Sequence, residues 1–213
     1  ISIILITHYM EEAVDADRIL LMDSGKLVMD GSPRKVFLNV ERLREYRMDV
    51  PLITELAHKL QKKGFPIEKT ILKKEELEEE LFKLDREGFV LKEELLKQDK
   101  EGGNPFSKEQ SIELEKMESQ GEAEVDLAQN ENAVLGDYIV EVNQLSAIFQ
   151  EGTAMESFAL KDLSMKIRRG SLTAVIGHTG SGKSTLVQLL NGLLQPTDGT
   201  VYVDGTDLSC KSK

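Results

Sequence analysis

A glycine-rich loop in the second half of the chain has residue types and spacing that could do chemistry. Gly177, Gly182, Lys183 and Ser184 fit the pattern G-x-x-x-x-G-K-[ST], which binds nucleotide phosphates. Glycines allow a tight turn that brings backbone N–H groups close to an anion. The lysine can reach the β- and γ-phosphates, and the serine hydroxyl can ligate Mg²⁺. The loop therefore predicts a nucleoside triphosphate as the ligand.

The sequence on either side of this loop supplies the elements that must position it. Residues 172–176 (LTAVI) form a short apolar run that favours a strand buried on both faces. Leu186, Leu189, Leu190 and Leu193 then recur at i, i+3, i+4 and i+7, which predicts a helix with one apolar face. The N-terminal end of that helix points its positive dipole at the phosphates. Strand, loop and helix together disfavour the alternative of a chance glycine-rich turn.

Composition excludes several classes of protein. The 213 residues carry a net charge of −11 without a dense basic cluster, so nucleic acid is not an expected partner. No apolar run approaches the roughly 20 residues that span a bilayer, and no signal peptide is visible. The single cysteine, Cys210, excludes an internal disulfide and fits a reducing compartment. The chain begins inside an apolar run and stops soon after a predicted strand, so we expect a fragment.

Periodicity and turn residues predict the other elements. We expect the N-terminal part to contain, in order, a strand over 1–6, a short helix over 9–16, a hairpin of 19–22 and 26–29, and helices over 33–39, 51–63 and 75–84. Ser32 and Pro33 suit the start of the helix over 33–39. We expect the C-terminal part to contain strands at 139–142, 145–149, 163–167, 172–176 and 200–203.

An acidic stretch separates these two parts. Residues 92–134 hold 12 acidic side chains against 5 lysines, with few apolar residues. Such a composition buries too little surface to offset its ordering entropy. We therefore expect a flexible linker over 98–133.

Two stretches resemble parts of one known family, the ABC transporter ATPases. Residues 139–207 resemble the N-terminal part, and within them residues 177–201 (GHTGSGKSTLVQLLNGLLQPTDGTV) are similar to the ATPase subunits of energy-coupling factor (ECF) transporters. Residues 1–84 resemble the C-terminal part, most clearly at 4–37 (ILITHYMEEAVDADRILLMDSGKLVMDGSPRKVF). The tail at 49–65 (DVPLITELAHKLQKKGF) resembles the ECF-type C-terminal extension.

The order of these parts is reversed relative to the family, in which the phosphate loop comes first. The resemblance therefore implies two fused ATPases, with the end of the first (1–97), a linker (98–133) and the start of the second (134–213) in this chain. It implies an incomplete α/β phosphate-loop NTPase fold with a mixed sheet and a helical extension. The family's glutamine loop, LSGGQ-type signature, strand-ending aspartate and catalytic glutamate are absent from these 213 residues. We expect the strands at 1–6 and 172–176 to pair with each other, which would bring His8 towards Lys183.

The resemblance also implies roles for single residues, with ATP and Mg²⁺ as cofactors. His8 matches the switch histidine that senses the γ-phosphate. Phe149 matches the aromatic position that stacks on adenine, and a core residue of a strand is the alternative. Thr185 reaches the α-phosphate and Ser184 ligates Mg²⁺. The implied nucleotide-binding set is Phe149, Gly177, Thr179, Gly180, Ser181, Gly182, Lys183, Ser184 and Thr185.

In function, the resemblance implies a transport ATPase that drives uptake of vitamins or of cobalt and nickel. Its expected partners are a second ABC ATPase domain, a transmembrane coupling subunit and a substrate-binding membrane subunit. Its expected place is the cytoplasmic face of the membrane, as a peripheral protein. Two alternatives stay open: another phosphate-loop enzyme, such as a kinase or GTPase, and an interaction module without catalysis.

Overall fold

The computed structural model describes residues 1–86, 137–150 and 152–209. The chain divides into two units, one of Ile1–Lys73 with Ala128–Lys213 and the other of Lys74–Leu127. The described part of the second unit is helix α5 (Lys74–Arg86), which confirms the helix expected over 75–84. The linker expected over 98–133 lies outside the described residues.

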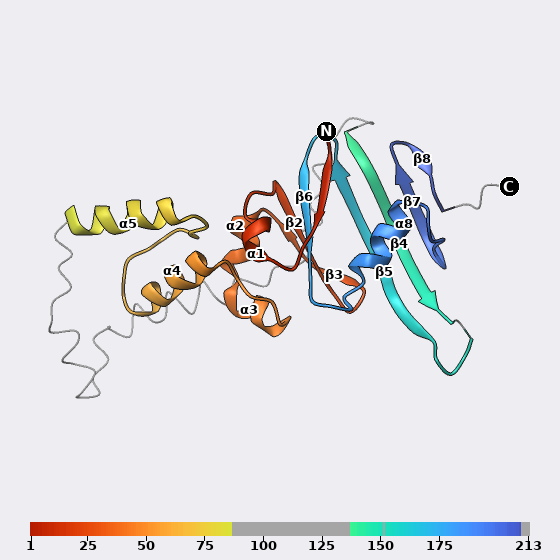
Figure 1. Ribbon diagram of the computed structural model, residues 1–213, viewed down its shortest axis with the longest axis horizontal. Helices are drawn as coiled ribbons and strands as arrows, with labels where there is room; N and C mark the ends of the chain where they lie inside the picture. The colour runs from red at the N-terminus through yellow and green to blue at the C-terminus, as the bar shows by residue number, and fades with distance from the viewer. Residues whose placement is uncertain (87–136, 151, 210–213) are drawn as a thin grey trace. The chain divides into compact units, whose positions relative to one another are not determined.

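A mixed four-stranded sheet forms the centre of the first unit (Figure 1). Its order is β1 (Ile3–Ile6), β6 (Leu172–Ile176), β2 (Arg18–Asp23) and β3 (Lys26–Gly31). The strand β6 pairs in parallel with both β1 and β2, and β3 closes an antiparallel hairpin with β2. The phosphate-loop strand therefore lies between two strands from the N-terminal part of the chain. This confirms the predicted pairing of 1–6 with 172–176.

A second sheet is entirely antiparallel. Its order is β5 (Ser157–Arg168), β4 (Tyr138–Phe149), β7 (Asp198–Val203) and β8 (Thr206–Asp207). The strand β4 is continuous where the sequence predicts two strands, and its pairing shifts register near Gln144. That residue has φ +48°, and its N–H bonds the Ser164 hydroxyl at 2.9 Å. An irregularity of this kind, typical of a β-bulge, bends a strand without ending it.

The helices of this unit are short. They are α1 (Met10–Ala13), α2 (Pro33–Leu38), α3 (Val40–Glu45), α4 (Leu52–Lys62) and α8 (Lys183–Leu190). The predicted cap of α2 is confirmed, since the Ser32 hydroxyl accepts the Lys35 N–H. The sequence did not predict helix α3. The expected apolar face of α8 is confirmed as far as Leu190 but is wrong at Leu193, which follows the helix and is 75% exposed.

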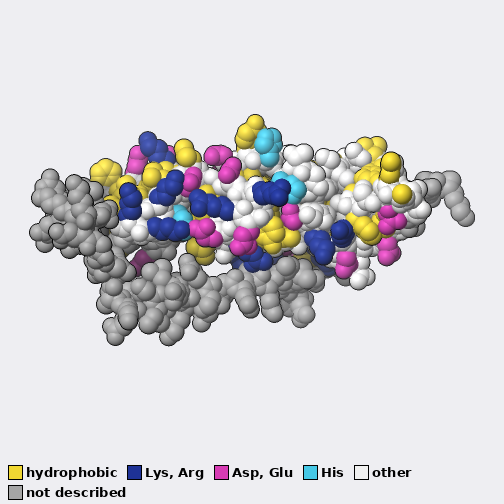
Figure 2. All heavy atoms as spheres, turned by 90° about the horizontal axis from the view of Figure 1, so that it is seen from below, with side chains coloured by type: hydrophobic (Ala, Val, Ile, Leu, Met, Phe, Trp, Pro, Cys, Tyr) yellow, Lys and Arg dark blue, Asp and Glu magenta, His cyan; other side chains and the backbone are white. Residues whose placement is uncertain are grey.

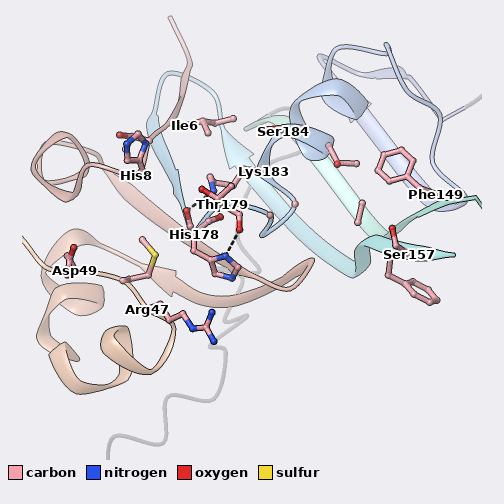
Figure 3. Close-up of a pocket in the computed structure, with 18 residues that line it drawn as sticks. Ile6, His8, Arg47, Asp49, Phe149, Ser157, His178, Thr179, Lys183 and Ser184 are labelled. Carbon is pink, nitrogen blue, oxygen red and sulfur yellow. Dashed lines mark hydrogen bonds between the residues drawn. The ribbon is translucent and has the colours of Figure 1, made fainter. Parts of the chain in front are cut away.

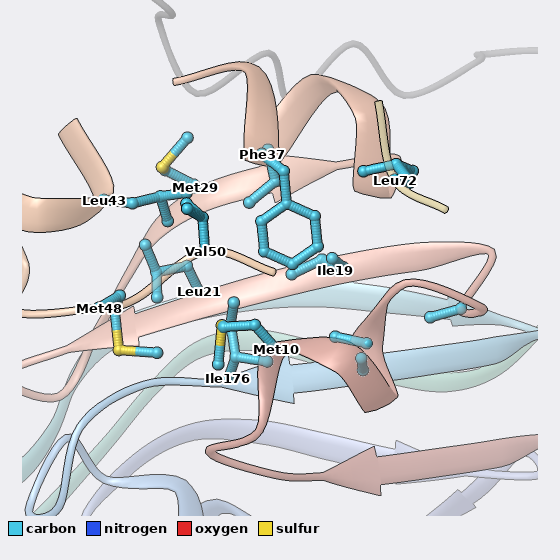
Figure 4. Packing of buried hydrophobic residues seen from close by; sticks show 14 of the residues in the cluster. Met10, Ile19, Leu21, Met29, Phe37, Leu43, Met48, Val50, Leu72 and Ile176 are labelled. Carbon is cyan, nitrogen blue, oxygen red and sulfur yellow. The ribbon is translucent and has the colours of Figure 1, made fainter. Parts of the chain in front are cut away.

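The central sheet is apolar on both faces and separates two cores. On β2, Ile19 and Leu21 pack on one side with the residues of α1, α2 and α3 (Figure 4), whereas Leu20 and Met22 pack on the other. The second core also holds the buried leucines of α8 and the inward residues of the antiparallel sheet. Alternation along a strand places successive side chains on opposite faces. Strand β6, which leads into the phosphate loop, is therefore held between two packed layers.

A partly buried ion pair takes part in a polar link between the N-terminal and C-terminal parts of the chain. The Arg18 guanidinium pairs with the Asp30 carboxylate and also donates to the Lys166 carbonyl at 2.6 Å. The hydrogen bond from Asp30 raises the pKa of Arg18 above its ordinary value. One guanidinium thus joins β2, β3 and β5.

The surface mixes charges of both signs. On the face drawn in Figure 2, Lys and Arg side chains are interspersed with Asp and Glu rather than gathered into one basic area. Among the helices that the structure describes, none has the length and apolarity needed to cross a bilayer.

Candidate nucleotide-binding site

The phosphate loop lies between β6 and α8, as the sequence predicts. Strand β6 ends at Ile176, and α8 begins at Lys183 with Gly182 at its N-cap in a left-handed conformation, φ +103°. Within the described residues, no side chain caps the first N–H groups of α8. Unpaired N–H groups at a helix N-terminus, together with the helix dipole, form a site for an anion.

The lysine of the motif lies inside the loop. Its Nζ donates to the carbonyl oxygens of Gly177 at 2.6 Å and His178 at 2.8 Å, and to the Ser181 hydroxyl at 3.2 Å. Burial lowers the pKa of Lys183 below its ordinary value. Ser181, within the loop, is fully buried. The loop thus orders the ammonium group at the position where a polyphosphate would meet it.

A pocket of about 710 Å³ opens above the loop (Figure 3). It is lined by nine of the ten residues that the sequence and the family resemblance assign to the site, and Ser181 is the one that does not line it. Those nine are His8, Phe149, Gly177, Thr179, Gly180, Gly182, Lys183, Ser184 and Thr185.

His8 and Phe149 reach this pocket from different sheets. His8 follows β1, its ring centroid lies 4.1 Å from that of Tyr9, and its side chain is exposed. It lines the pocket together with Lys183, as the predicted pairing of the strands requires. Phe149 ends β4 and is 44% exposed, which contradicts the alternative of a core residue. An exposed aromatic ring on the pocket wall is suited to stacking on a base.

The turn between β2 and β3 forms the floor of the loop, a feature that the sequence did not reveal. The Gly25 N–H donates to the Ser181 carbonyl at 3.1 Å, and the Gly25 carbonyl accepts the Lys161 N–H at 2.8 Å. A Cβ at Gly177 would collide with the Met22 carbonyl oxygen and lie 2.6 Å from the Ser181 hydroxyl. The glycine at 177 is therefore needed for close packing against the turn as well as for phosphate binding.

His178 makes a second unpredicted link between the loop and this turn. Its Nε2 lies 2.7 Å from the Asp23 carboxylate, and its Nδ1 lies 2.6 Å from the Thr179 carbonyl. The imidazole therefore ties the turn to the loop backbone, a role that the sequence did not predict for either residue.

The third unpredicted part of the pocket comes from the segment after α3. Arg47, Met48 and Asp49 line the wall, although this segment has no motif that marks it for a site. Its contribution depends on the fold of the N-terminal part, which brings residues about 135 positions before the loop to the same cavity.

The arrangement fits a nucleoside polyphosphate. The loop offers backbone N–H groups, the Lys183 ammonium and the Ser184 hydroxyl, and a Cβ at Gly180 would meet nothing within 4 Å. Among the described residues no group of three His, Cys, Asp or Glu side chains could hold a metal ion. Mg²⁺ ordinarily binds through substrate phosphates with few protein ligands, and Ser184 is placed to supply one of them.

Parts of this chain are similar in sequence to known proteins. Residues 160–213 match the family model described as ABC transporter. An energy-coupling factor transporter ATP-binding protein, EcfA1 of Caldanaerobacter subterraneus, is 56% identical over 79 residues, 37% of this chain and 28% of the relative. A putative ABC transporter ATP-binding protein of the same organism is 30% identical over 210 residues, 97% of this chain and 30% of the relative.

One solved structure with a related sequence is cbiO1 from Clostridium perfringens, described as part of the ABC transporter complex cbiONQ. It is 38% identical over 35% of this chain and 29% of its own, with a TM-score of 0.32. The chain spans less than a third of the curated relatives that it matches, including EcfA1 at 28%. The comparisons confirm the predicted similarity to ABC transporter ATPases and to the ATP-binding proteins of ECF transporters.

Proposed function

We propose that this chain is the ATP-binding part of an ABC transporter ATPase of the ECF type. One observation carries the proposal: the phosphate loop, His8 and Phe149 line a single pocket although they come from distant parts of the sequence. The loop recognises the phosphates, and Phe149 offers a ring for the adenine. His8 stands where a switch histidine would sense the γ-phosphate.

The remaining roles follow from chemistry at the loop. Gly177, Gly180 and Gly182 leave the N–H groups open to the phosphates, with Thr179 and Ser181 between them. Lys183 neutralises the β- and γ-phosphates, and Ser184 ligates Mg²⁺. Thr185, in the first turn of α8, meets the α-phosphate.

The chain is proposed to bind ATP without hydrolysing it. Phosphoryl transfer requires a metal held from two sides and a group that orients the attacking water. The glutamate, aspartate and signature loop that supply these functions in the family have no counterpart in the sequence. Loss of one general base typically costs about 10²- to 10⁴-fold in rate, and several such groups are missing together.

The parent protein is proposed to contain two fused ATPase units. The relative that is 30% identical over 97% of this chain supports this, because its alignment of 210 residues extends over both the N-terminal and the C-terminal part. Uptake of vitamins or of cobalt and nickel, and a peripheral position at the cytoplasmic face of a membrane, follow from the ECF resemblance. The proposed partners are a second ATPase domain, a transmembrane coupling subunit and a substrate-binding membrane subunit.

The decisive experiment is a calorimetric titration with Mg-ATP of the purified chain and, separately, of its Lys183→Ala variant. We expect the unchanged chain to bind ATP and the variant to lose measurable binding, because the β- and γ-phosphates lose their main counter-ion. Phosphate release by the unchanged chain should not exceed that of the variant. Equal binding by both proteins would contradict the proposal.

The two alternatives give different results in the same assay. A phosphate-loop GTPase would bind GTP more tightly than ATP. Stacking on Phe149 does not by itself distinguish the two bases, and the resemblance to ABC transporter ATPases predicts that ATP binds. An interaction module without a nucleotide site would bind neither. In such a module the loop would have no reason to keep Lys183 and Ser184, which both line the pocket here.

A further inference from the structure

Arg47 lies on the pocket wall opposite the aromatic end of the site. In Figure 3, Phe149 and Arg47 lie on opposite sides of the phosphate loop, and the guanidinium of Arg47 extends towards His178. Within the described residues, this guanidinium makes no hydrogen bond or ion pair. The pocket therefore has an aromatic ring at one end and a cation at the other.

The backbone of Arg47 is unusual for its residue type. It follows α3 at the position where helices commonly end on glycine, with φ +58°. Its N–H bonds the Arg44 carbonyl at 2.9 Å, and the Met48 N–H bonds the Leu43 carbonyl at 2.9 Å. Those two bonds are the Schellman pattern, in which a side chain is strained and glycine is not. Strain that persists beside a pocket points to a function for the side chain.

The neighbours of Arg47 hold its backbone in place. Met48 and Val50 are buried in the core beneath α3, so the side chain leaves the wall from a fixed point. Among the described residues that line the pocket, Asp49 provides the carboxylate, and Lys183 and Arg47 provide the ammonium and guanidinium groups. Basic side chains outnumber acidic ones in the lining, which favours an anionic ligand.

We propose that Arg47 binds the terminal phosphate of the nucleotide. In Figure 3, Lys183 lies between the side of the pocket with Phe149 and the side with Arg47. A nucleotide with its base at Phe149 and its β-phosphate at Lys183 would therefore have its γ-phosphate on the side that Arg47 lines. A guanidinium donates two parallel hydrogen bonds to phosphate oxygens, which an ammonium does not. The residue thus selects triphosphate over diphosphate. This inference rests on the proposed function, since it assigns a further contact within the same site.

The test is calorimetric titration of the full 213-residue chain with Mg-ATP and Mg-ADP, comparing Arg47→Gly and Arg47→Gln with the unchanged protein. Losing a hydrogen bond to a charged group should raise the Kd for ATP by about tenfold. The Kd for ADP should change less than about threefold, because ADP lacks the contacted phosphate. Arg47→Lys should lie between, since it keeps the charge and loses the paired geometry.

Thermal unfolding separates this role from a structural one. Arg47→Gly removes the left-handed strain, so its Tm should equal or exceed that of the unchanged chain while its ATP affinity falls. Gln144→Gly is the matched control for the backbone, because Gln144 is exposed, has φ +48° and lies outside the pocket lining. Arg44→Gln is the control for charge on the same segment, and neither control should change the Kd for ATP.

Three results would overturn the inference. The first is an unchanged Kd for ATP in Arg47→Gly, and the second is an equal loss for ATP and ADP. The third is a loss of ATP affinity in the Arg47 variants that is accompanied by a matching fall in their Tm. If the unchanged chain binds ATP and Lys183→Ala does not, these results reject Arg47 alone. If the unchanged chain binds no ATP, the proposed function and this inference both fail.

Discussion

Helices α4 and α8 both present leucines at helical spacing, and only α8 buries them. Leu186 and Leu189 of α8 are each 1% exposed, whereas Leu52 and Leu56 of α4 are 74% and 47% exposed. The sequence pattern is the same kind in both helices. Spacing therefore predicts that a face exists but not what covers it.

Different contacts hold the two helices. The α8 leucines pack into the core between the central sheet and the antiparallel sheet. Helix α4 is held through Ala57, which is buried, and through the Thr54 hydroxyl, which donates to the Ile71 carbonyl at 2.6 Å. A helix can thus be anchored by its small and polar residues while its leucines face outwards.

The largest expected effect separates these two leucine faces. Leu189→Ala should lower the free energy of unfolding by about 3 kcal/mol, because it leaves a cavity in a closed core. Leu56→Ala should change it by less than about 0.5 kcal/mol, because about half of this residue is already exposed to solvent and no closed core surrounds it. Urea denaturation of both variants measures the difference. Equal losses would show that the α4 face is covered in solution and would break the comparison.

The second-largest expected effect on stability comes from the contact that holds the phosphate loop before α8. Gly177→Ala would place a methyl group against the Met22 carbonyl oxygen, and overpacking of this kind should cost about 2 kcal/mol. Gly180→Ala in the same loop has open space around its Cβ, so only its left-handed backbone, φ +84°, should cost about 1 kcal/mol. The midpoints of urea denaturation of the two variants test whether the end of β2 and the β2–β3 turn support the loop. A larger loss of stability in Gly180→Ala than in Gly177→Ala would contradict this.

Local patterns in the sequence account for the parts of the fold that could be predicted. The strand, loop and helix around Lys183 follow from residues within 25 positions, as does the hairpin of β2 and β3. The family resemblance added His8 and Phe149, which the structure brings to the same pocket.

What could not be predicted depends on contacts between distant residues or on backbone strain. The register shift in β4 follows from the left-handed backbone of Gln144, which no residue type announces. Arg47 occupies a position where glycine is common, so its pocket contact has no sequence signal. The pairing of His178 with Asp23 joins residues 155 positions apart. Tertiary packing alone makes such pairs visible.

The smallest expected effect concerns this last pair, at the junction of the loop and the turn. In a double-mutant cycle, Asp23→Ala and His178→Ala should show a coupling free energy of about 0.5 to 1 kcal/mol, because both side chains are partly exposed.

The pair between Arg169 and Asp204 is the control for this cycle, since it joins two more exposed side chains at the surface. Its coupling should be smaller than that of His178 with Asp23. His178→Ala should also lower ATP affinity, because the Thr179 carbonyl loses the imidazole that contacts it. Arg169→Ala should leave ATP affinity unchanged. A coupling at His178 no larger than at Arg169 would mean that the loop is held by Gly25 and Met22 without help from the imidazole, and the polar link between turn and loop would then have no energetic role.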